Sequence, residues 1–109
     1  MTTQFPVIGP RELAAAHAAG ETLILLDVRE ANEFAAMRAP FSAHHALSLL
    51  RNGTLPPFAK SERLYVVCQA GARSEAATVL LRNAGFENVT NVVGGMTAWE
   101  KAGLPVSRG

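Results

Sequence analysis

The only cysteine of the chain, Cys68, lies where its thiol could act as a nucleophile. The residues before it, 64–67, form a short apolar run rich in β-forming side chains, which is typical of a buried strand. After it, Ser74 is predicted to cap the N-terminus of a helix that continues through residues 75–82. Cys68 would therefore lie at the carboxyl end of a strand and beside a helix N-terminus, where open α/β sheets bind ligands.

The predicted loop between this strand and this helix favours a negative charge. A helix N-terminus offers unpaired N–H groups and the positive end of the helix dipole, and the amides of the loop can add an anion-binding nest. Gly71 permits a tight turn or a positive φ, and Arg73 adds a positive charge. These features favour thiolate over thiol at Cys68. The alternative is an unreactive buried thiol that packs as a small hydrophobic group.

This loop resembles the active-site loop of the rhodanese family of sulfurtransferases, whose pattern is C-x-x-G-x-R. In this chain the stretch reads Cys68, Gln69, Ala70, Gly71, Ala72, Arg73 and Ser74. The resemblance implies that Cys68 is the catalytic residue and that the five residues after it bind the substrate and the persulfide. The loop has six residues from cysteine to arginine, the length that suits sulfur in this superfamily, whereas the related phosphatases carry one more.

Two further stretches resemble the same family, in the same order. Residues 27–34 match D-V-R-x-x-x-E-[FY], which implies that Asp27, Arg29 and Glu33, together with Ser74, support the site and tie loops together rather than transfer protons. Residues 94–106 match the C-terminal signature G-G-M-x-A-W-x-x-A-G-L-P-V. The resemblance spans residues 8–106. It fails at residues 37–42, where the family has G-H-I-P-G-A and this chain keeps only the proline.

The alternation of apolar strands and helical segments predicts an α/β domain with a parallel sheet and helices on both faces. Extended segments are expected within residues 2–8, 22–29, 43–46, 64–67 and 86–93, the final segment being the last strand, with helices between and after them. The resemblance implies a rhodanese-like three-layer sandwich with about five strands. With 109 residues and no visible linker or repeat, residues 1–109 are expected to form a single domain.

Composition excludes several classes of partner and site. A net charge of +1 gives no long-range attraction to nucleic acid or to an acidic membrane, and no apolar run is long enough to span a bilayer. A single cysteine excludes an internal disulfide, and a free thiol suits the reducing cytoplasm, where we expect this chain because residues 1–5 do not resemble a signal peptide. His44 and His45 are adjacent in an extended segment and should face opposite sides, so we expect no metal site and no cofactor.

The family resemblance implies a sulfurtransferase that uses covalent catalysis. Cys68 would take sulfane sulfur from a small donor such as thiosulfate or a persulfide, hold it as a persulfide, and pass it to cyanide or a thiol. The donor or acceptor could also be a protein. Gln69 and Ala70 are uncharged where family members that use thiosulfate well often carry basic residues, so Arg73 supplies the only positive charge of the loop. Two alternatives are a non-catalytic interaction module with the same fold and a phosphatase- or arsenate-reductase-like enzyme that uses the same thiolate.

Overall fold

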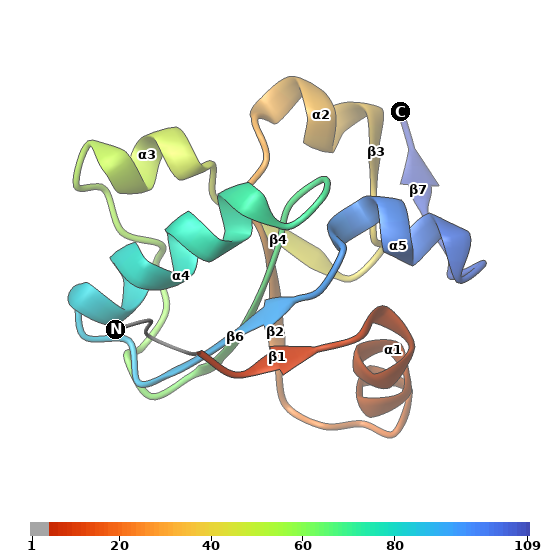
Figure 1. Ribbon diagram of the computed structural model, residues 1–109, viewed down its shortest axis with the longest axis horizontal. Helices are drawn as coiled ribbons and strands as arrows, with labels where there is room; N and C mark the ends of the chain where they lie inside the picture. Colours follow the sequence, from red (N-terminus) through yellow and green to blue (C-terminus); the bar gives the residue numbers. More distant parts are fainter. Residues whose placement is uncertain (1–4) are drawn as a thin grey trace.

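The computed structural model describes residues 5–109 and contains a central sheet of five parallel strands (Figure 1). Each neighbouring pair of strands in this sheet runs in the same direction. In spatial order the strands are β1 (Val7–Ile8), β6 (Asn88–Val92), β5 (Arg63–Val67), β2 (Ile24–Asp27) and β4 (Ser42–His44). The predicted α/β class and the five-strand parallel sheet are confirmed. Residues 2–4 of the first predicted extended segment lie outside the described residues.

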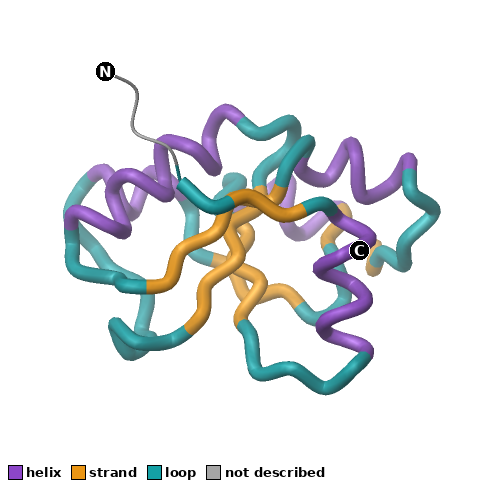
Figure 2. Tube along the Cα trace, turned by 60° about the horizontal axis from the view of Figure 1, so that its bottom comes forward, coloured by secondary structure: helices purple, strands orange, loops and turns teal. Residues whose placement is uncertain are grey.

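Helices cover both faces of the sheet and give three layers (Figures 1 and 2). On one face lie α1 (Pro10–Ala18) and α5 (Gly95–Lys101), and on the other lie α3 (Leu47–Arg51) and α4 (Ala72–Asn83). The side chains of β5 alternate between the two cores. Leu64 and Val66 pack with α3 and α4, whereas Tyr65 and Val67 pack with the core that holds Trp99 of α5. This burial on both faces explains the continuous apolar run before Cys68.

The segment that departs from the family pattern forms a strand that the sequence did not predict. After α2 (Ala31–Ala36), the short strand β3 (Met37–Arg38) pairs in antiparallel fashion with β7 (Ser107–Arg108), apart from the main sheet. The expectation that residues 86–93 contain the last strand is therefore wrong. Strands of two residues carry no detectable alternation, and their pairing joins segments about seventy residues apart, so no local pattern reveals them.

Candidate active site

Cys68 directly follows β5, the middle strand of the sheet, and its side chain is almost fully buried, with 1% exposed. The next three residues turn the chain into α4, which begins at Ala72. Gly71 is the N-cap residue of α4 and has a φ of 118°, a left-handed value that favours glycine. The prediction that Ser74 is the N-cap is therefore wrong. The positive φ of Gly71 lets the helix begin early, and Ser74 lies within its first turn.

Hydrogen-bond donors of the loop and of the first turn of α4 surround the Cys68 sulfur. The backbone N–H of Gly71 donates to Sγ at 3.0 Å, and the Ser74 hydroxyl lies 3.4 Å from Sγ while donating to the Gly71 carbonyl at 2.9 Å. Burial raises the pKa of the Cys68 thiol. The hydrogen bond between the Ser74 side chain and the sulfur, together with those from the backbone N–H groups of Ser74, Gly71 and Ala70, outweighs burial, so the pKa is lowered overall. The geometry favours a thiolate.

The N-terminus of α5 holds the carbonyl groups of the same loop. Met96 N–H donates to Cys68 O at 2.8 Å, and Thr97 N–H donates to Gln69 O at 3.0 Å. Gly95 makes this approach possible, because a Cβ atom built on it would lie 2.3 Å from Cys68 O and 2.6 Å from Gln69 O. Gly95 belongs to the C-terminal family signature, but its contact with the loop has no signal in the local sequence.

Arg73 does not stand alone beside the thiol. Its guanidinium donates to both carboxylate oxygens of Glu33 in a two-point ion pair, with nitrogen–oxygen distances of 2.6 and 2.8 Å. The hydrogen bond from Arg73 is the largest of the effects that lower the pKa of Glu33 to about 2, against partial burial, which raises it. This pair ties α4 to α2 across forty residues of sequence. Glu33 therefore neutralises much of the charge that Arg73 brings to the loop.

A second, buried ion pair supports the other side of the loop. Arg29 Nη2 lies 2.8 Å from Asp27 Oδ2, and both side chains are inaccessible or nearly so. Arg29 also donates to Gln69 Oε1 at 3.2 Å and to the Met37 carbonyl at 2.6 Å. Gln69 in turn donates to Thr97 Oγ1 at 3.1 Å. The structure therefore brings Asp27, Arg29 and Gln69 together.

The two adjacent histidines bind backbone carbonyl groups. His44 Nε2 lies 2.7 Å from Arg29 O, and His45 Nε2 lies 2.8 Å from Thr54 O. Among residues 5–109, no group of three or more potential side-chain ligands is arranged to hold a metal ion. Over the same residues, no helix is long and apolar enough to cross a membrane.

The family profile described as "Rhodanese-like domain" matches residues 9–102. The chain belongs to the rhodanese-like domain family. This match covers the first two stretches that suggested the family from sequence, residues 94–102 of the third, and residues 37–42, which depart from the family's usual pattern.

Several named proteins and a solved rhodanese-like domain are similar to this chain. "Thiosulfate sulfurtransferase 16, chloroplastic" of Arabidopsis thaliana is 37% identical in an alignment 91 residues long that covers 73% of this chain and 76% of that protein. "Putative sulfur carrier protein YrkF" of Bacillus subtilis is 34% identical over 72% of this chain and 42% of that protein. The chain spans less than half the length of several of its relatives. The solution structure of the rhodanese-like domain of an Anabaena protein has a TM-score of 0.86, with 26% identity, 96% coverage of this chain and 80% coverage of that domain.

Proposed function

We propose that this protein is a sulfurtransferase that carries sulfane sulfur as a persulfide on Cys68. The hydrogen bond from Gly71 N–H to Sγ is the observation that carries this proposal, because it stabilises a thiolate at the end of the central strand. The similarity to relatives named as sulfurtransferases supports the same conclusion. It also favours catalysis over a non-catalytic interaction module, for which the intact cysteine and its donors would have no use.

The proposed reaction has two steps, and each exchanges one bond to sulfur. In the first, the Cys68 thiolate attacks the outer sulfur of the donor. A bond forms between the two sulfur atoms, and the donor leaves with the electron pair of its broken bond, as sulfite when the donor is thiosulfate. In the second, an acceptor thiolate or cyanide attacks the outer sulfur of the persulfide, and Cys68 leaves as a thiolate. The backbone amides of residues 69–73 would stabilise the anionic sulfur in both steps.

The charges of the loop bear on the choice of donor. Gln69 and Ala70 are uncharged, and the Arg73 guanidinium is paired with Glu33, so little unshared positive charge is available for the sulfonate of thiosulfate. We therefore propose a persulfide as the better donor and a thiol, small or on a protein, as the acceptor. The relative named as a putative sulfur carrier supports a protein partner. We place this reaction in the cytoplasm, where a free thiol stays reduced.

Intact mass spectrometry tests the proposal directly. Incubation with a low-molecular-weight persulfide should add the mass of one sulfur atom to the chain, and a later thiol chase should remove it. Thiosulfate should load the same site more slowly. A chain that gains no sulfur from either donor, or whose added sulfur lies on a residue other than Cys68, would contradict the proposal. Efficient hydrolysis of a phosphate ester would instead favour the phosphatase-like alternative.

A further inference from the structure

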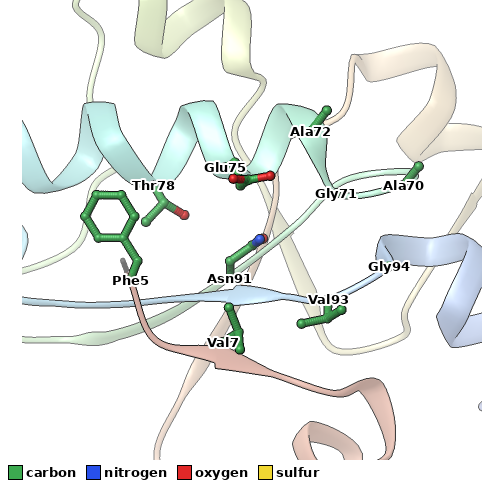
Figure 3. A pocket seen from close by; sticks show the side chains of 10 residues that line it. All are labelled: Phe5, Val7, Ala70, Gly71, Ala72, Glu75, Thr78, Asn91, Val93 and Gly94. Carbon is green, nitrogen blue, oxygen red and sulfur yellow. The ribbon is translucent and has the colours of Figure 1, made fainter. Parts of the chain in front are cut away.

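A cavity of about 610 Å³ lies behind the active-site loop, between α4 and the β1 edge of the sheet (Figure 3). Gly71 and Gly94, which have no side chains, form the end of the cavity nearest the loop, and Cys68 is not part of its wall. Its volume lies within the range that holds small molecules. Much of the wall is apolar. Val7 and Val93, which line it, are 63% and 49% exposed, so the cavity opens to solvent beside an uncovered apolar surface.

One buried polar group in this cavity has no partner. Asn91 of β6 is 8% exposed, and its side-chain oxygen Oδ1 is buried without a hydrogen bond among the described residues. Figure 3 shows the Asn91 amide extending from the strand toward α4, and Glu75 extending from the helix toward it. An unpaired buried carbonyl oxygen costs free energy. A half-turn of the amide, whose two ends have nearly the same shape, would present this acceptor to a ligand in the cavity.

The charges of the wall identify the kind of ligand. Glu75 is exposed, belongs to no ion pair within residues 5–109, and is the only charged residue of the wall in that range. The Arg82 guanidinium stacks on the Phe5 ring at 5.0 Å and does not line the cavity. Thr78 already donates its hydroxyl proton to the Ser74 carbonyl. The Glu75 carboxylate is therefore the one charged acceptor of the wall, and the Asn91 amide, once turned by a half-turn, adds its oxygen as a second acceptor.

We propose that this cavity binds a primary ammonium compound with a small apolar body. The ammonium group donates to the Glu75 carboxylate and to the Asn91 amide oxygen, and the apolar body packs against Phe5, Val7 and Val93. The bound molecule lies against Gly71, whose N–H donates to the Cys68 sulfur. The cavity is thus a second binding site directly behind the reactive loop.

Backbone amide NMR on the full chain tests this site with three matched probes: 2-phenylethylammonium, the neutral 2-phenylethanol and the anionic 3-phenylpropanoate. The ammonium probe should bind most tightly and should shift the resonances of Gly71, Val93 and the Asn91 side-chain amide. The alcohol should bind more weakly, and the anion should not bind there. Shifts confined to other parts of the molecule, or an anion that binds as well as the ammonium, would overturn the proposal. The measurement involves no sulfur transfer, so its outcome is independent of the proposed function.

Two variants and one control separate the polar contacts from general binding to an apolar surface. Glu75→Gln should weaken binding of the ammonium probe by about 3-fold, the size expected of one exposed ion pair, and should leave the alcohol unaffected. Glu12→Gln changes the same residue type in the first turn of α1, away from the cavity, and should have no effect. Asn91→Leu removes the unpaired acceptor at similar volume, so the chain should stay folded while its preference for ammonium over alcohol falls. An unchanged preference in both Glu75→Gln and Asn91→Leu would contradict the assigned contacts.

Discussion

The Arg73 guanidinium and the Glu33 carboxylate form a two-point ion pair, with nitrogen–oxygen distances of 2.6 and 2.8 Å. The pair joins the first turn of α4 to α2, so the loop that carries Cys68 is anchored from outside the sheet. It also means that the only positive charge of the loop that carries Cys68 is shared with a carboxylate. The backbone amides and Ser74 are therefore the main groups that stabilise a thiolate at Cys68.

The proposed nucleophile leads to the first prediction. Cys68→Ser should reduce sulfur transfer to background, because an alcohol cannot form the persulfide. The free energy of unfolding should change by about 1 kcal/mol or less, since serine fits the same space and keeps a hydrogen-bonding atom. Transfer rates and urea denaturation of both proteins check this expectation. A folded Cys68→Ser protein that retains most of its activity would rule out the mechanism.

Ser74 and Arg73 should differ in their effect on the thiol. The pKa of Cys68 is lowered below its ordinary value by hydrogen bonds, with Ser74 the largest favourable contributor, while burial opposes them. Ser74→Ala should therefore raise this pKa more than Arg73→Ala, because Ser74 contacts the sulfur and Arg73 is engaged by Glu33. The pH dependence of Cys68 alkylation measures the pKa of the thiol in each variant, since only the thiolate reacts.

Arg73→Ala should show its effect in binding instead. The substitution should weaken the binding of anionic donors such as thiosulfate more than the binding of neutral donors, because it removes charge near the loop and leaves the amides in place. A larger pKa rise in Arg73→Ala than in Ser74→Ala would contradict this division of roles.

The ion pair of Glu33 makes a contribution to stability that depends on pH. The pKa of Glu33 falls from 4.5 to about 2 on folding, so its contribution is complete above pH 4.5 and is lost as the pH falls toward 2. Glu33→Gln should lower the free energy of unfolding at pH 7 by about 1 kcal/mol or less, because both side chains are partly exposed.

Urea denaturation of both proteins from pH 7 to pH 2 measures this contribution, and the two curves should converge at the acid end. Glu100→Gln, which breaks the more exposed pair with Arg108, is the matched control and should show a smaller effect. A difference that stays constant down to pH 2 would show that the Glu33 contribution is not electrostatic.

Gly95 should be the most sensitive glycine of the chain to a methyl group. In Gly95→Ala the new Cβ would overlap the carbonyl oxygens of Cys68 and Gln69, and the φ of 59° is left-handed. We expect a loss of about 3 kcal/mol or more in the free energy of unfolding, as well as impaired sulfur transfer, because backbone atoms must move. Gly20→Ala has a similarly positive φ but no atom within 4 Å of the new Cβ, so it should cost about 1 kcal/mol. Equal losses in the two variants would show that the close approach of α5 to the loop is unimportant.

Local sequence patterns by themselves determined the order of the main strands and helices without β3 and β7, the parallel sheet and the position of Cys68 at the end of its central strand. They succeeded because alternation, apolar runs and turn residues act over a few neighbouring positions. The family resemblance added the expected extent of the loop and the expectation that Asp27, Arg29 and Glu33 support it. It did not say which charges meet.

The tertiary structure alone decided the contacts between distant segments. Arg73 meets Glu33, Gln69 meets Arg29 and Thr97, and Gly95 meets the carbonyl of Cys68 across 27 to 40 residues of chain. The N-cap at Gly71 in place of Ser74 follows from the left-handed backbone of Gly71, a conformation that glycine permits but does not require. Such contacts depend on how the layers pack. The local sequence around a residue does not indicate which distant residue it will contact. The cavity around Asn91 arises in the same way, where α4 and the edge of the sheet leave a polar group uncovered.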